Sequence, residues 1–113
     1  MGYLHYGSSS EPIEIPDRLL AHIKVVIATK LRRNESFTLS WQHPAHQTPG
    51  RSTIWLQPSI ELRFVFGSVE AEKLDSALLQ QFANAANSSG GLIVDLDDRL
   101  APAERPVHAL RSA

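Results

Sequence analysis

Hydrophobic residues recur along this chain with two different periods, and the changes of period predict where helices and strands lie. Between Asp17 and Arg33 the apolar side chains follow helical spacing, on one side of the segment: Leu19, Leu20, Ile23, Val26, Ile27 and Leu31. This 3.6-residue periodicity predicts an amphipathic helix whose apolar side faces a core. Asp17 is the expected N-cap, because a carboxylate there accepts hydrogen bonds from first-turn amides.

Alternation with a period of two predicts strands on both sides of this helix. Two short strands are expected at 3–6 and 12–15, and three longer ones at 37–42, 53–57 and 61–66. Successive side chains of a strand point to opposite faces, so each strand turns one apolar row toward the helix and one row outward. The short link at Pro58-Ser59 favours antiparallel pairing of the last two strands.

A second helix is predicted over 70–87, with a buried stripe and a glycine-rich end at Gly90-Gly91; the stripe comprises Leu74, Leu78, Phe82 and Ala85. A last strand at 92–96 is apolar enough to lie inside a sheet. The pattern therefore predicts an α+β fold, a mainly antiparallel sheet of about five or six strands with two helices packed on one face. Residues 1–96 form the expected single domain, and 97–113 the expected loosely held or disordered tail.

Composition narrows the class of protein without naming a reaction. A chain of 113 residues is long enough for one domain with its own core. A formal net charge of −1 gives no overall field that would attract a polyanion. The absence of cysteine excludes disulfides and thiolate metal sites. No apolar run reaches the ~20 residues of a membrane helix, and the first residues do not resemble a signal peptide, so we expect a cytoplasmic protein without membrane contact.

The outward face of the predicted sheet carries the clearest candidate binding residues. It combines a tryptophan with two cations among small polar side chains: Trp55, Arg51 and Arg63. An exposed tryptophan beside arginine is typical of a protein-binding anchor, and it is also able to stack on a nucleobase. The alternative is a tryptophan covered by a loop or by the tail. The expected partner is a second copy of the chain, forming a homodimer, or another protein.

The polar side of the first helix supplies a second candidate surface. Arg18, His22, Arg32 and Arg33 would lie along it, where cations are able to contact phosphates. The alternative is a solvated helix side whose last cations complement the helix dipole. This surface supports the second hypothesis for function, a module associated with nucleic acid.

No residue pattern predicts a metal, a cofactor or a reaction. His43-Pro44-Ala45-His46 has metal-like spacing, but no nearby carboxylate or cysteine completes a ligand set. Asp95, Asp97 and Asp98 cluster at the end of the last strand, where two or three carboxylates are able to hold Mg²⁺, but a phosphate-binding loop and a second acidic cluster are absent, and a charged strand end is the favoured interpretation. A Gly-x-Ser-x-Gly elbow and a glycine-rich phosphate loop are both absent from the sequence. We therefore expect a non-catalytic interaction or structural module without a cofactor.

Several runs of the sequence resemble a family of small, uncharacterised actinobacterial proteins. They include Asp17-Arg18-x-Leu20-Ala21-His22-Ile23, Gly50-Arg51-Ser52-Thr53-Ile54-Trp55-Leu56, and Asn87-Ser88-Ser89-Gly90-Gly91-Leu92, within a similarity that extends from Met1 to about Val94. Many members are described as ATP-dependent DNA ligases, and the resemblance implies no established site residues. The ligase motif Lys-x-Asp-Gly is missing here. Its nearest counterpart, Lys73-Leu74-Asp75-Ser76, lacks the glycine and lies in a predicted helix.

Overall fold

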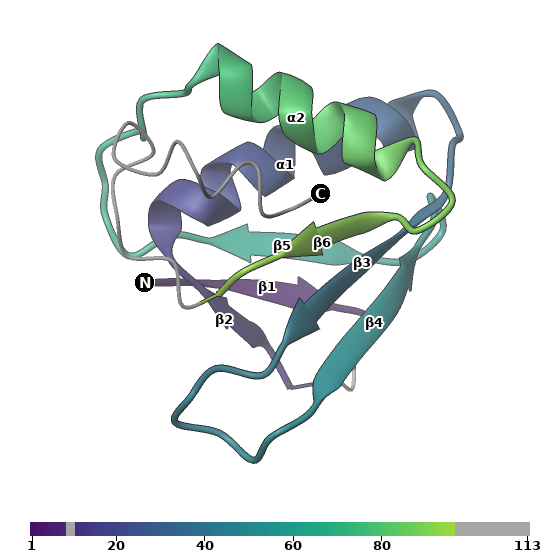
Figure 1. Ribbon diagram of the computed structural model, residues 1–113. Coiled ribbons are helices and arrows are strands. Elements are labelled where there is room, and N and C mark those ends of the chain that lie inside the picture. The colour runs from purple at the N-terminus through teal and green to yellow at the C-terminus, as the bar shows by residue number, and fades with distance from the viewer. Residues whose placement is uncertain (9–10, 97–113) are drawn as a thin grey trace.

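A computed structural model describes residues 1–8 and 11–96 of the chain. The strands in these residues form two sheets of three strands each (Figure 1). The first sheet contains β2 (Ile13–Ile15), β1 (Gly2–Tyr6) and β5 (Leu62–Val65), in that order and all antiparallel. The second sheet contains β4 (Arg51–Leu56), β3 (Phe37–Gln42) and β6 (Leu92–Val94). In the second sheet β4 is antiparallel to β3 and β6 is parallel to it.

The predicted α+β class is therefore confirmed, with six strands among the described residues, but the single sheet is only roughly matched. The predicted pairing of β4 with β5 is wrong. β5 pairs with β1 of the first sheet, where Phe64 lies opposite Leu4. The link at 57–61 does turn, through a hydrogen bond from the Ile60 N–H to the Gln57 carbonyl. A turn reverses the chain, but it does not require the two strands to pair with each other.

Helix α1 (Asp17–Arg32) buries the predicted apolar side against β1 and against the second helix. The N-cap residue is Pro16, so the N-cap prediction for Asp17 is wrong. The Asp17 carboxylate instead accepts from the Gly67 N–H, at 3.1 and 3.0 Å from its two oxygens, and lies 3.7 Å from the terminal ammonium. Asp17 thus ties the start of α1 to the N-terminus and to the segment after β5.

Helix α2 (Ser76–Ala86) begins six residues later than predicted. Asp75 is its N-cap, and Oδ1 of Asp75 accepts from the N–H groups of Ala77 (2.9 Å) and Leu78 (3.4 Å). Because this carboxylate satisfies the first-turn donors, the helix starts here and not at Glu70. Leu74 consequently lies outside the helix and is 48% exposed, whereas Phe82 is buried as predicted.

Both helices lie on the same side of the molecule in Figure 1, with α2 against β6 and β3. The core between helices and sheets is formed by fully buried side chains from both sheets and from α1, among them Leu4, Ile15, Leu20, Ile23, Ile27, Leu39, Leu56 and Leu92. Among the described residues, neither helix is long and apolar enough to cross a membrane. The predicted tail at 97–113 lies outside the described residues, and the domain boundary stays a prediction.

Candidate functional site

The second sheet has an inner face that is buried and an outer face that is open. Its inner side chains include Phe37, Leu39, Trp41, Leu56, Leu92 and Val94, all buried. The alternating side chains form what we call the outer face: Thr38, Ser40, Gln42, Arg51, Thr53, Trp55 and Ile93. Trp55 is 54% exposed and Ile93 67% exposed, so two large apolar side chains stand on this face. This confirms that Trp55 is exposed.

Polar side chains of β3 run between these two apolar residues. Ser40 pairs with Thr53 of β4 on one side and with Ile93 of β6 on the other. The hydroxyl oxygens of Ser40 and Thr53 are 2.8 Å apart, within hydrogen-bond distance. The result is a mixed surface, apolar at both flanks and hydroxyl-rich in the middle. Sequence reasoning missed Ile93, because the apolar strand predicted over 92–96 was expected inside the sheet, whereas β6 is an outer strand and an apolar run gives no indication of which side chain is exposed.

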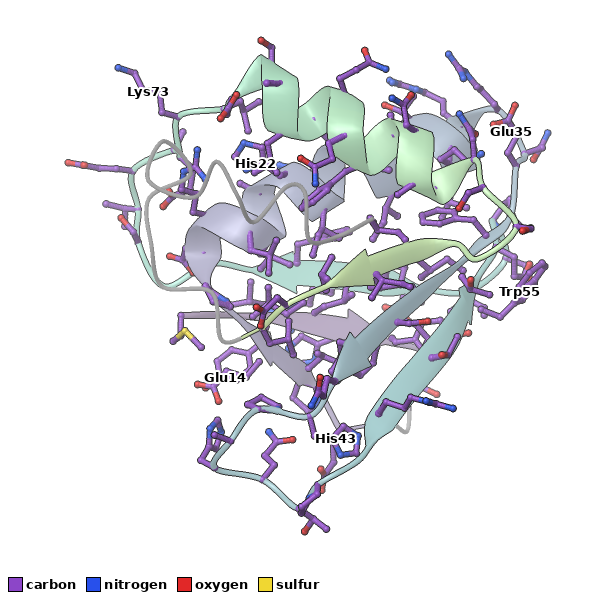
Figure 2. All side chains as sticks on the ribbon, viewed as in Figure 1. Glu14, His22, Glu35, His43, Trp55 and Lys73 are labelled. Atoms are coloured by element: carbon purple, nitrogen blue, oxygen red, sulfur yellow. The ribbon has the colours of Figure 1, made fainter. Side chains whose placement is uncertain are left out.

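Trp55 is held by its backbone while its indole remains exposed. The Tyr6 hydroxyl, from the end of β1, donates a hydrogen bond to the Trp55 carbonyl and so links the two sheets. Figure 2 shows the Trp55 side chain at the end of β4, directed away from the body of the molecule. A fixed backbone under an exposed aromatic ring lowers the conformational cost of using that ring as an anchor.

The two arginines predicted to accompany Trp55 are placed differently. Arg51 is exposed in the same outward row of β4 as Trp55. Arg63 is exposed in β5 of the first sheet, where it pairs with His5. The expectation that Arg63 shares a sheet face with Trp55 is therefore wrong, and the reason is the pairing of β5 with β1.

The predicted phosphate-contacting set is not one cluster either. Arg18 and Arg32 lie fourteen residues apart at opposite ends of α1, which corresponds to about 21 Å along a helix axis. Arg18 Nη2 lies 3.9 Å from Asp75 Oδ2, which partly neutralises its charge. Arg32 and Arg33 are exposed neighbours at the end of the helix. Phosphate contact by these residues stays a prediction.

His22, the remaining member of that set, is fully buried, so its predicted place on an exposed side is wrong. Its Nδ1 lies 2.7 Å from the Arg18 carbonyl oxygen, and its Nε2 accepts from the Asp75 N–H at 2.9 Å. The start of α2 packs on this side of α1 and removes it from water (Figure 2). The sequence did contain an indication that His22 is buried. His22 lies four residues before the buried Val26, and residues at this spacing share one side of a helix.

Lys30, near the end of α1, does not lie on the surface with the exposed Arg32 and Arg33. It is only 9% exposed, and its ammonium donates to Asn87 Oδ1 at 2.6 Å and to Glu35 Oε1 at 3.1 Å. The same ammonium lies 5.9 Å from the centre of the Phe37 ring. Lys30 therefore joins the end of α1 to the start of β3 and the end of α2, and it does not belong to an exposed cationic surface.

The hairpin loop between β3 and β4 holds a further arrangement of polar groups. His43 Nδ1 lies 2.9 Å from the Thr48 carbonyl oxygen, and His43 Nε2 lies 2.8 Å from the Ser52 hydroxyl oxygen. His46 of the same loop is exposed. Within residues 1–8 and 11–96, no three histidine or carboxylate side chains are grouped so as to hold a metal ion.

Over residues 1–8 and 11–96, these features define a small α+β domain of two three-stranded sheets and two helices, in which the outer face of the second sheet carries the exposed apolar side chains of Trp55 and Ile93. Residues 1–97 match the model of a family described as a domain of unknown function (DUF7882), and the chain belongs to that family. No curated protein and no solved structure gives a significant match to the chain.

Proposed function

We propose that the outer face of the second sheet is a non-catalytic interaction surface, through which this domain binds another protein chain. The observation that carries the proposal is the pair of exposed apolar side chains, Trp55 and Ile93, on one open face of packed strands. Trp55 is the proposed anchor, and Arg51 of the same row is the proposed polar clamp. Arg63 contacts a partner only if that partner extends to the first sheet.

Physical reasoning supports this face over other parts of the surface. Tryptophan and arginine are enriched among the residues that dominate protein–protein binding, and such residues typically cost about 2 kcal/mol or more when truncated. The hydroxyls of Ser40 and Thr53 bond to each other, so covering these two side chains costs less than covering two unpaired hydroxyls. A partner that covers them would also bury the apolar side chains of Trp55 and Ile93.

A second copy of the chain is the first partner to test, because most soluble oligomers are homo-oligomers. Sedimentation velocity over a range of concentrations would compare the natural protein with Trp55→Ala, with Leu74→Ala as the matched control. Leu74 is also an exposed apolar residue, 48% exposed, but lies outside the outer face. We expect a concentration-dependent dimer for the natural protein and for Leu74→Ala, and a monomer for Trp55→Ala with an unchanged far-UV spectrum.

Two results would contradict this proposal. Equal association of Trp55→Ala and Leu74→Ala would show that the outer face is not the interface. Unfolding of Trp55→Ala would show that the indole stabilises the domain itself. A natural protein that stays monomeric excludes the second copy as partner and directs the search to a different protein.

The second candidate function is an accessory module associated with nucleic acid. The exposed neighbours Arg32 and Arg33 favour it. The ligase description of the actinobacterial family that the sequence resembles favours it as well. It predicts saturable binding of oligonucleotides that weakens steeply with salt and is lost in an Arg32→Gln/Arg33→Gln variant. Binding that persists in this variant would contradict it. A cytoplasmic location is proposed with either function.

We infer that the chain is not a self-sufficient ATP-dependent ligase. Lys73, the nearest counterpart of a ligase nucleophile, is exposed in the segment just before α2, and Asp75 is engaged as the N-cap of that helix. Incubation with radiolabelled ATP should leave no adenylate on the protein, and a labelled Lys73 would overturn this inference.

A further inference from the structure

The hairpin between β3 and β4 joins a serine and a histidine that are nine residues apart in the sequence. Ser52 Oγ and His43 Nε2 are 2.8 Å apart, and His43 Nδ1 lies 2.9 Å from the Thr48 carbonyl oxygen. A carbonyl oxygen only accepts hydrogen bonds, so Nδ1 of His43 carries a hydrogen. In the neutral imidazole Nε2 is then an acceptor, and the Ser52 hydroxyl donates to it.

This order of donors and acceptors is the one that activates a serine. A nucleophile lies within hydrogen-bond distance of a base, and a third group orients the base and fixes its tautomer. Here the third group is the Thr48 carbonyl. We propose that Ser52 is an activated nucleophile and His43 its general base, and that the pair accepts acyl groups from carboxylic esters that reach the hairpin surface.

The loop does not need the bond between Ser52 and His43 for its shape. The His43 N–H donates to the Gly50 carbonyl at 2.8 Å, and the Gln47 N–H donates to the Pro44 carbonyl at 2.9 Å, so backbone bonds already close it. Gly50, with φ of 152°, also packs closely on the imidazole, because a Cβ there would lie 3.1 Å from Nδ1 of His43. These contacts hold the imidazole in place without the bond to Ser52.

Ser52 and His43 are accessible to a ligand from outside. Both are half-buried, so part of each residue remains in contact with solvent, although Ser52 lies in the inward row of β4, opposite Trp41. Figure 2 shows His43 at the base of the hairpin loop, on the side of the molecule away from the helices. In the proposal a small ester reaches the pair through the solvent-exposed part of these two residues, at the hairpin end of the sheet.

The backbone next to Ser52 supplies a donor for the developing oxyanion. The His43 N–H donates to the Gly50 carbonyl, so these two residues form a hydrogen-bonded pair of the antiparallel ladder. Hydrogen-bonded and non-hydrogen-bonded pairs alternate along such a ladder, and Ser40 opposite Thr53 is therefore a non-hydrogen-bonded pair. The Thr53 N–H then points away from β3, toward the free edge of β4, the outer strand of its sheet. This N–H is one residue from the nucleophile and is not used in pairing with β3.

The proposed reaction balances without any further reactant except water. Ser52 Oγ forms a bond to the ester carbonyl carbon, and its proton moves to His43 Nε2. The bond to the alkoxide leaving group then breaks, and the proton passes from His43 to that group. Water hydrolyses the acyl-serine by the same steps, which returns Ser52 and its proton to the starting state.

A fluorophosphonate probe tests the nucleophile directly, because it bonds to activated serines with loss of fluoride. The folded full-length protein is incubated with the probe, and the labelled peptide is identified by mass spectrometry. The variants are Ser52→Ala, His43→Gln and the matched control Ser40→Ala, whose hydroxyl bonds only to Thr53. The natural protein unfolded in urea serves as a control that needs no substitution.

We expect one label on Ser52 in the folded protein and in Ser40→Ala, none in Ser52→Ala, and a rate about 10²-fold lower in His43→Gln and in urea. The folded protein should also release p-nitrophenolate from p-nitrophenyl acetate, and Ser52→Ala should not. Labelling of folded protein no faster than in urea, or labelling that persists in Ser52→Ala, would overturn the proposal.

Discussion

Replacement of the buried His22 by phenylalanine tests how the two helices are held together. The ring of His22 fills a fully buried site, and its Nε2 accepts the Asp75 N–H at the N-cap of α2. Phenylalanine keeps most of the volume and removes the acceptor. His22→Ala removes the volume as well, so the pair of variants separates the hydrogen bond from the packing.

The structure sets the size of both effects. A donor left without its partner costs about 1–3 kcal/mol, and the Asp75 N–H is half-buried, which favours the lower part of that range. His22→Phe should therefore lower the free energy of unfolding by about 1–2 kcal/mol. His22→Ala adds the loss of a buried ring and the resulting cavity, which brings the expected loss to about 3–5 kcal/mol.

Equilibrium denaturation in urea measures both losses, with tryptophan fluorescence as the signal. Trp41 is buried, at 8% exposure, so its emission should shift when the core opens. An unchanged slope of free energy against urea would show that the two-state treatment holds for each variant. His46→Phe is the matched control: His46 is exposed in the hairpin loop, and its replacement should change the stability by less than about 0.5 kcal/mol.

A small effect of His22→Phe would refute the reasoning. If His22→Phe and His46→Phe both changed the stability by less than about 0.5 kcal/mol, the bond between His22 and Asp75 would contribute nothing. If His22→Ala had equally little effect, the ring would lie in solvent, as the sequence pattern alone suggested.

Two further substitutions test other contacts between elements. Gly91 has φ of 74°, and a Cβ there would overlap the Thr38 hydroxyl. Gly91→Ala should therefore lower the free energy of unfolding in urea by about 2–4 kcal/mol, from left-handed backbone strain and overpacking together. An unchanged midpoint would contradict this placement of β6 beside β3. Lys30→Met keeps the buried aliphatic stem but leaves Asn87 Oδ1 without its donor. Thermal unfolding should therefore show a free energy of unfolding lower by about 1–3 kcal/mol. A more stable variant would show that the ammonium is not needed there.

Much of the local structure was predictable, since it depends on neighbours in sequence. The apolar side of α1 was visible as 3.6-residue periodicity and is buried as predicted at Leu20, Ile23 and Ile27. The alternation in β3 and β4 correctly separated Leu39 and Leu56 from Trp55. Helix starts were predicted less well, because Asp17 and Asp75 are equally plausible caps in sequence and only the second performs that role.

The candidate site was predictable only in part. The exposure of Trp55 followed from the alternation predicted over 53–57. Arg51 lay outside that predicted strand, and the position of Arg63 depended on which strand β5 would pair with. The bond between Ser52 and His43 was not predictable, because nothing in the composition of the 43–50 loop specifies how it folds back on the strand after it.

The sequence by itself therefore determined which side chains share a helix side or a strand face, because backbone geometry sets those periods without reference to the rest of the chain. Only the tertiary structure decided which sides meet. The packing of α2 on α1 made His22 and Lys30 interior residues, and the pairing of β5 with β1 divided the expected single sheet in two. Those outcomes depend on contacts between segments far apart in the chain, whose energies no local pattern records.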